Sequence, residues 1–121
     1  MDRNTRVKPI RGNSPGSAGV YGIVRTGACL DDLVSPGREF KVLVQRRDGN
    51  WVVNDGLIEL ALERGRLIME AYEKREDRLW LYKVFAVPKP LLKGFEDYVL
   101  EWVREEELPR FVRVESGVRV I

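Results

Sequence analysis

The nine residues from Leu79 to Val87, LWLYKVFAV, constrain the fold of this chain more than any other segment. The run is rich in β-branched and aromatic residues and predicts a strand over 79–87 with apolar side chains on both faces. Such a strand is typically central in its sheet, so we expect a neighbouring strand on each side of it. One face would carry Trp80, Tyr82, Val84 and Ala86, and the other Leu79, Leu81, Lys83, Phe85 and Val87.

Two other segments predict strands at the ends of the ordered chain. Residues 19–25, GVYGIVR, alternate and are β-branched, and Gly22 within them suggests a bulge or a close backbone approach. Residues 111–121 predict a terminal hairpin whose three-residue loop ends at Gly117. In that hairpin Arg113 and Arg119 would lie opposite one another on a solvated or anion-binding face.

Residues 40–53 predict a second hairpin. Its turn is Asp48-Gly49, a pair that the type I′ two-residue turn favours. This turn sets Val44 opposite Val53 and agrees with the apolar alternation on both sides of it. One face of the hairpin would then carry Phe40, Val42, Val44, Trp51 and Val53.

The longest helix is predicted over 56–75, after an N-cap at Asn54 or Asp55. The alternative divides this segment at Gly65 into a helix and a strand, but residues 66–74 alternate poorly and are nearly all helix formers. The apolar arc of the long helix is wider than one sheet face needs, and a glycine within it allows close approach of a partner copy. We therefore expect a homo-oligomer formed through Leu57, Ala61, Gly65, Ile68 and Tyr72.

A second helix is predicted over 90–107, with Pro90 in its first turn and an apolar stripe at helical spacing. The elements together predict an α+β domain, with a mostly antiparallel sheet of about five to six strands and two amphipathic helices packed on one face. Residues 19–121 would form this single domain, preceded by a basic flexible arm over 1–18.

The composition excludes several classes of catalytic and metal site. There is no histidine, which removes Ser-His-Asp and Cys-His triads and histidine-bearing zinc sites. Cys29 is the single cysteine, so no disulfide forms within the chain; we expect a small apolar filler, with a reactive thiol as the alternative. We expect no cofactor, no metal and no membrane partner, and a cytoplasmic location. Fifteen of the 21 cations are arginine, and this arginine-rich, highly charged composition is typical of a thermophile.

The leading functional hypothesis is a non-enzymatic nucleic-acid-binding protein, which fits single strands best. Arginine grips phosphates through two hydrogen bonds and stacks on bases, and exposed aromatic rings stack on bases as well. The alternative for each ring is an ordinary core position, and for the arm a solvated terminus. The expected nucleic-acid-binding residues are Arg3, Arg6, Lys8, Arg11, Arg46, Arg47, Trp51, Arg78, Trp80, Tyr82, Lys83, Arg113 and Arg119.

Two other functions stay open. The first is a structural or adaptor subunit of a protein assembly, with the broad helix and the acidic run Glu105–Glu107 as docking surfaces. The second is a small metal-dependent nuclease, in which Glu39-Phe40-Lys41 with upstream acidic residues would hold a cation and orient water. Three matching residues in a chain with 33% charged residues carry little specificity.

Overall fold

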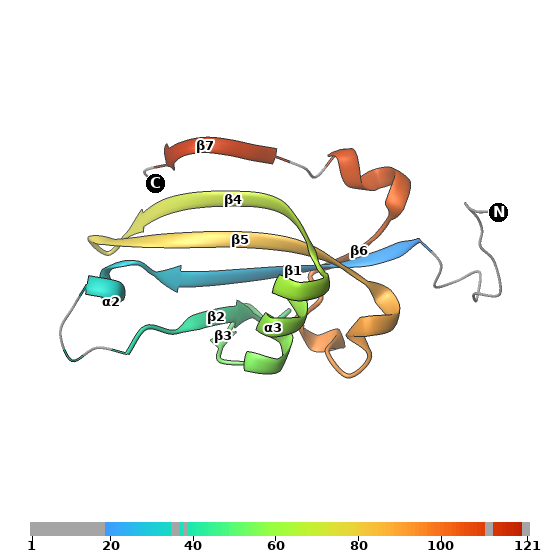
Figure 1. Cartoon of the computed structure of the whole chain (residues 1–121), viewed down its shortest axis with the longest axis horizontal. Helices are drawn as coiled ribbons and strands as arrows, with labels where there is room; N and C mark the ends of the chain where they lie inside the picture. Colours follow the sequence, from blue (N-terminus) through green and yellow to red (C-terminus); the bar gives the residue numbers. More distant parts are fainter. Residues whose placement is uncertain (1–18, 35–36, 38, 111–112, 120–121) are drawn as a thin grey trace.

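The strand expected at the centre of the sheet is there. The computed structural model describes residues 19–34, 37, 39–110 and 113–119, the last of these as backbone only. In it β5 (Arg78–Pro88) pairs antiparallel with β1 (Val20–Cys29) on one side and with β4 (Arg66–Arg75) on the other (Figure 1). The register of β5 confirms the two faces predicted for residues 79–87, because its odd and even residues pair with separate sets on β1.

β1 is longer than the predicted strand over 19–25 and continues to Cys29. This length gives β1 two partners on its other edge. β6 (Glu101–Arg104) lies beside residues 20–23, and β2 (Val42–Gln45) lies beside residues 26–28. Within the described residues the sheet order is β3-β2-β1-β5-β4-β7, with β6 also on β1; β3 is Trp51–Val52 and β7 is Arg113–Arg119.

The hairpin predicted over 40–53 forms, but its register was predicted wrongly by one residue. The backbone N–H of Arg46 donates to the carbonyl of Asn50, and that of Gly49 donates to the carbonyl of Arg46. With Gly49 at φ +97°, this is a three-residue loop ending in a left-handed residue, not a two-residue turn. Val44 therefore pairs with Val52, and Trp51 moves to the opposite face of the hairpin from Val44.

The long helix predicted over 56–75 is wrong, and the rejected alternative is the one that occurs. α3 (Asp55–Arg64) begins at Asn54, whose side chain accepts a hydrogen bond from the backbone N–H of Leu57, and it ends at Gly65 in extended conformation. Residues 66–75 are β4, because pairing with β5 outweighs their helix propensity. A register shift between Leu67 and Met69 breaks the strand's alternation, which is why the apolar pattern alternated poorly.

The second helix predicted over 90–107 is also wrong. It is replaced by two 3₁₀ turns, η1 (Lys89–Leu92) and η2 (Glu96–Tyr98), then β6, then η3 (Glu105–Arg110). Gly94 at φ +92° separates the two turns. The helix-like apolar spacing arises because η1, the end of η2 and β6 each place one residue in the protein core: Leu92, Val99 and Val103.

The terminal hairpin predicted over 111–121 does not form in the described segment. β7 runs as one strand through Glu115–Gly117 and lies parallel to β4. Arg113 pairs with Met69 and Arg119 with Glu73, so the two arginines lie near opposite ends of β7 and not opposite one another. Residues 111–112 and 120–121 lie outside the described residues.

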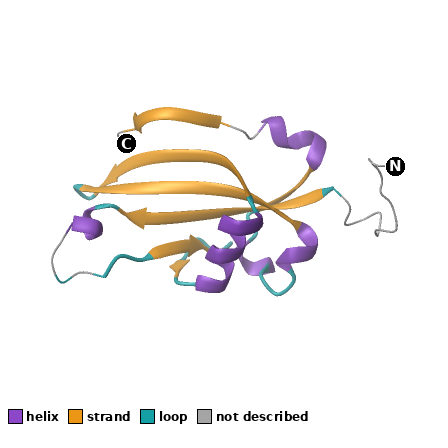
Figure 2. Ribbon diagram, viewed as in Figure 1, coloured by secondary structure: helices purple, strands orange, loops and turns teal. Residues whose placement is uncertain are grey.

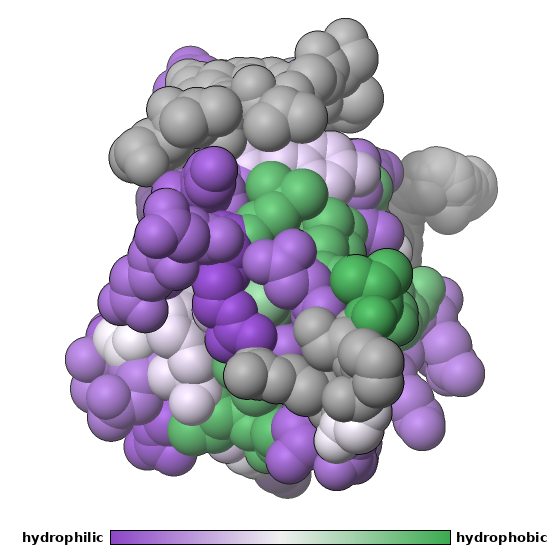
Figure 3. Space-filling model, turned by 90° about the vertical axis from the view of Figure 1, so that its left-hand side faces the viewer, coloured by the Kyte–Doolittle hydropathy of each residue, from purple (hydrophilic) through white to green (hydrophobic). Residues whose placement is uncertain are grey.

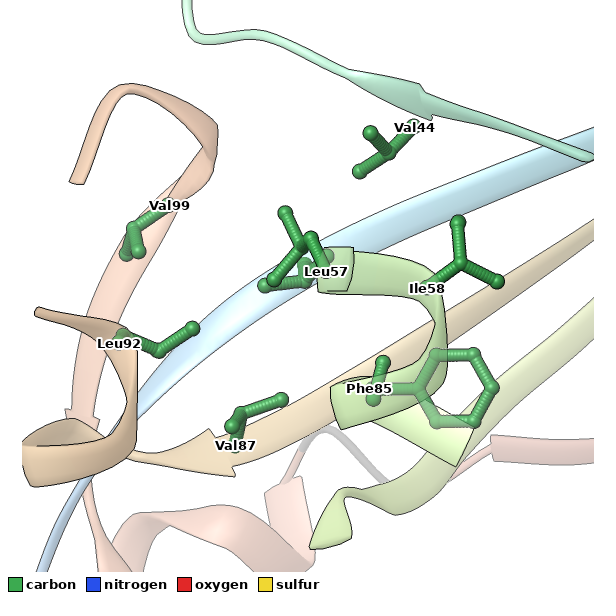
Figure 4. Close-up of a cluster of buried hydrophobic side chains, with 9 residues drawn as sticks. Val44, Leu57, Ile58, Phe85, Val87, Leu92 and Val99 are labelled. Atoms are coloured by element: carbon green, nitrogen blue, oxygen red, sulfur yellow. The ribbon is translucent and has the colours of Figure 1, made fainter. Parts of the chain in front are cut away.

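Each face of the sheet has its own apolar cluster. α3 and η1 cover one face (Figure 2), where Leu57 and Ile58 of α3 form a buried cluster with Val44, Phe85 and Val87 of the strands (Figure 4). On the other face Ile23, Ile68, Val84, Ala86 and Val103 surround Leu108 of η3. The α+β class and the mostly antiparallel sheet are thus confirmed, whereas two helices on one face are not. No helix of the described part is long and apolar enough to cross a membrane.

Gly22 has neither the bulge nor the close backbone approach that was expected there; side chains pack against it instead. A Cβ at this position would lie 2.5 Å from Cδ1 of Leu92 and 3.0 Å from Cζ3 of Trp102. The glycine therefore lets η1 and β6 seat directly on β1.

Candidate nucleic-acid interface

A pocket of about 150 Å³ lies on the face of the sheet opposite α3, toward the end where β4 and β5 turn. All the residues that line it come from strands and their connecting turn, so no described helix contributes to it. Three aromatic rings dominate its walls. The lining residues are Gly27, Leu43, Trp51, Arg75, Glu76, Trp80 and Tyr82.

The length of β1 creates the floor of this pocket. Gly27 lies opposite Tyr82 of β5 on one side and Leu43 of β2 on the other. A Cβ at Gly27 would lie 3.1 Å from Cζ3 of Trp51 and 3.2 Å from Cδ1 of Tyr82. The absence of a side chain therefore lets both rings close over the strand.

The one-residue slip of the β2–β3 hairpin supplies the third ring. Trp51 pairs with Gln45, so its side chain lies on the same face as Gly27 and Tyr82. The ring centroids of Trp51 and Tyr82 are 5.7 Å apart with a tilt of 46°. Under the predicted register Trp51 would have lain on the face with Val44, away from Tyr82.

Arg25 is stacked against this aromatic pair. Its guanidinium carbon lies 4.5 Å from the ring centroid of Tyr82 and 5.6 Å from that of Trp51. It makes no ion pair with a carboxylate in the described part of the chain, and its nearest polar contact is a 3.5 Å approach to Oε1 of Gln45. Its Nε is buried without a hydrogen-bond partner among the described atoms. Arg25 is therefore a half-buried cation without an ion pair in the described chain, stacked on two of the rings that line the pocket.

A second arginine borders the pocket on its other side. Nη1 of Arg75 donates a hydrogen bond of 2.9 Å to the hydroxyl of Tyr82, and Nε lies 3.7 Å from Oε1 of Glu73. The hydrogen bond to Tyr82 raises the pKa of Arg75, so this side chain stays cationic. Arg75 precedes the tight turn at Glu76-Asp77, where both residues have positive φ, 51° and 63°.

The predicted aromatic residues meet at this site. Tyr82 is 2% exposed and forms the base of the pocket, whereas Trp51 and Trp80 are half-buried and reach its surface. Tyr82 therefore has the core position that was the alternative for each ring, whereas Trp51 and Trp80 stay partly exposed.

The predicted cations of the sheet do not gather there. Arg46 pairs with Asp48 at 3.4 Å and Asp97 at 3.7 Å, and Arg78 pairs with Asp32 at 2.9 Å. Lys83 pairs with Glu70 at 3.5 Å and faces away from Tyr82 and Trp80. Arg47 is exposed on the hairpin loop. The arm residues Arg3, Arg6, Lys8 and Arg11, and the side chains of Arg113 and Arg119, lie outside the described residues.

Sequence reasoning missed Arg25, Gly27 and Arg75. A strand extended beyond Arg25 would have placed Arg25, Gly27 and Cys29 on one face, but the small residues of TGAC are typical of a connection. Cys29 is buried opposite Trp80, in agreement with its expected role as an apolar filler.

The residues expected to mediate self-association do not form a common surface. Leu57, Ala61 and Ile68 are buried in the two apolar clusters of the chain itself, and Tyr72 lies on β4. Gly65 is close to its own chain, since a Cβ there would lie 2.5 Å from the carbonyl oxygen of Ala61. The broad apolar arc of the predicted helix does not form, because its residues belong to a helix and a separate strand.

The acidic and lysine residues proposed for metal chemistry are not assembled into a site. Glu39 and Lys41 are exposed on the segment before β2, not on a strand. Among the described residues, no three carboxylate or cysteine side chains are grouped as metal ligands. Comparisons with protein-family models, curated proteins and solved structures gave no match.

Proposed function

We propose that this protein binds single-stranded nucleic acid across the face of the sheet that carries the aromatic pocket. The observation that supports this proposal is Arg25, stacked on Trp51 and Tyr82 without a carboxylate partner in the described chain, next to a pocket lined by Trp51 and Trp80. A site that combines an unpaired cation with accessible rings matches the two parts of a nucleotide, a phosphate and a planar base.

The roles of the residues follow from their chemistry. Nη1 of Arg25 donates to Gln45, so its charge and Nη2 would contact a phosphate, and its ring contacts restrict its rotamers. Arg75 at the opposite rim and Arg47 on the hairpin loop add positive charge along the path of a strand. Trp51 and Trp80 offer surfaces on which bases can stack. The bases of a single strand are exposed and can reach these rings, whereas a duplex keeps its bases inside.

A fluorescence anisotropy titration with a labelled single strand tests the proposal. At low salt we expect saturable binding that weakens as salt rises, because phosphate contacts release counterions. Trp51→Leu and Trp80→Leu should weaken the binding, and so should Arg25→Gln. Absence of binding at low salt, or binding without salt dependence, would overturn the proposal.

Two matched substitutions control for general effects. Trp102→Leu removes the remaining tryptophan, which is 39% exposed on β6 and contacts Lys89 on the other face of the sheet. Arg64→Gln removes an exposed cation from α3. Both should leave strand binding close to that of the unmodified protein.

A second candidate function, an adaptor subunit of a protein assembly, has one observation in its favour. A second pocket, of about 260 Å³, opens between α3 and the sheet, where Leu62 is 62% exposed and Phe40 is 37% exposed. Apolar surface is also exposed at the end of the molecule that carries α2 (Asp31–Val34), where green areas lie among hydrophilic side chains (Figure 3). Leu62→Glu should abolish co-purification of a partner protein if this function is correct, and a lone monomer from the native source would contradict it.

A further inference from the structure

We infer that the aromatic pocket takes a single pyrimidine base, so that the protein prefers pyrimidine-rich single strands; this inference rests on the proposed function. Three properties of the pocket lead to it: its size, the charges at its rim and its glycine floor.

The size of the pocket fits one six-membered ring. Its volume is about 150 Å³, and an apolar cavity of roughly that volume in another protein accommodates benzene. A pyrimidine base has one such ring, whereas a purine has two fused rings and would project beyond the walls that Trp51 and Trp80 provide. A pyrimidine therefore keeps a larger fraction of its surface in contact with the pocket walls than a purine does.

The groups at the rim of the pocket suit the polar edge of a base. They suit a purely apolar ligand or a cationic ligand less well. Arg75 offers N–H donors and Glu76 lies beside it, so donor and acceptor are both available at the rim. Aromatic cages also bind quaternary ammonium ions. Here Arg25, unpaired in the described chain and 4.5 Å from the centroid of Tyr82, opposes a second cation and favours a neutral ring that carries an anionic phosphate.

Gly27 sets the depth of the pocket. A methyl group at this position would lie 3.1–3.2 Å from atoms of Trp51 and Tyr82, closer than relaxed contact, and would displace the rings that form the walls. Gly27→Ala should therefore close the pocket without removing any charge. Gly56→Ala is its matched control, because a methyl group at Gly56 meets only Oδ1 of Asn54, at 3.8 Å.

Three strands of equal length test the inference with the full-length protein: oligo-thymidine, oligo-deoxyadenosine and an abasic sugar–phosphate strand. Stacking contributes about 1–3 kcal/mol per base, so we expect the thymidine strand to bind roughly 5-fold to 150-fold more tightly than the abasic one. The adenosine strand should lie between them. Gly27→Ala should lower thymidine affinity more than abasic affinity, so that the ratio of the two falls toward 1, whereas Gly56→Ala should leave this ratio unchanged.

The outcomes separate this inference from the proposed function. Equal, salt-dependent binding of all three strands would overturn the pyrimidine pocket and leave single-strand binding intact. Tighter binding of adenosine than of thymidine would overturn the size argument, and displacement of the thymidine strand by millimolar tetramethylammonium, but not by equimolar sodium, would show a cation cage instead. Failure of every strand to bind at low salt would overturn both proposals.

Discussion

A single residue, Arg25, links the structure of this protein to its proposed function. A cation half-buried among aromatic rings, with its Nε unpaired and no ion pair in the described chain, contributes little to folding. A buried donor without a partner costs about 1–3 kcal/mol. The contacts with Tyr82 and Trp51 offset part of this cost. This balance is the reason that we propose an anionic ligand for Arg25.

Arg25→Met should therefore separate folding from binding. Methionine fills a similar space and removes the unpaired donor, so we expect the free energy of unfolding to stay within about 1 kcal/mol of the original value. Strand affinity should fall several-fold, because the phosphate contact is lost. Urea unfolding and the anisotropy titration measure the two effects, and a loss of stability well above this range with unchanged affinity would assign Arg25 a structural role.

At the scale of elements, the β4–β5 turn is where the backbone departs most from ordinary geometry. Arg75 pairs with Arg78, and the two residues between them, Glu76 and Asp77, both have positive φ. This is a type I′ turn without the glycine or asparagine that such turns favour. The strained turn holds Glu76 at the rim of the aromatic pocket.

Asp77→Gly should stabilise the protein. The left-handed conformation costs a residue with a Cβ roughly 1–2 kcal/mol, and glycine escapes this cost but gains entropy in the unfolded chain. We expect a net increase of about 0.5–1 kcal/mol in the free energy of unfolding, measured in urea. Asp77→Ala retains the Cβ and should give no such increase; equal stabilisation by both variants would show that the aspartate charge, not the backbone, is responsible.

At the scale of the whole molecule, we expect the N-terminal cations to contribute to the salt dependence of the proposed strand binding. The sequence from Met1 to Arg11 carries Arg3, Arg6, Lys8 and Arg11. Each phosphate contact contributes about 0.7 to the slope of log affinity against log salt for single strands. Replacing all four cations with glutamine should lower that slope by up to about 2.8. An unchanged slope would show that this segment is a solvated terminus and that the sheet alone binds the strand.

Strand binding should also be insensitive to pH near neutrality. The chain has no histidine, and the hydrogen bond to Tyr82 keeps the pKa of Arg75 above its ordinary value. The pocket therefore has no histidine to titrate near neutrality, and Arg75 keeps its charge between about pH 5.5 and about pH 7. The dissociation constant at constant ionic strength should be the same at both values, and a change of tenfold would contradict this prediction.

The sequence by itself determined which segments are strongly apolar. This was enough to predict the central strand, its two faces, the α+β class and the position of the hairpin over 40–53. It did not determine whether residues 66–75 and 90–107 are helical, because local propensity favours a helix in both segments. Residues 66–75 are a strand because they pair with one edge of β5, and this pairing depends on the tertiary structure.

Only the tertiary structure brought the candidate site together. Trp80 and Tyr82 were expected from their strand, but Trp51 joins them through a one-residue slip in a hairpin, and Gly27 and Arg25 through the extension of β1. Neither event has a strong local signal, because a register shift changes side-chain faces without changing the sequence pattern of the strand. Contacts between strands far apart in the chain fixed the pocket, for the physical reason that cross-strand pairing, and not propensity, sets which faces meet.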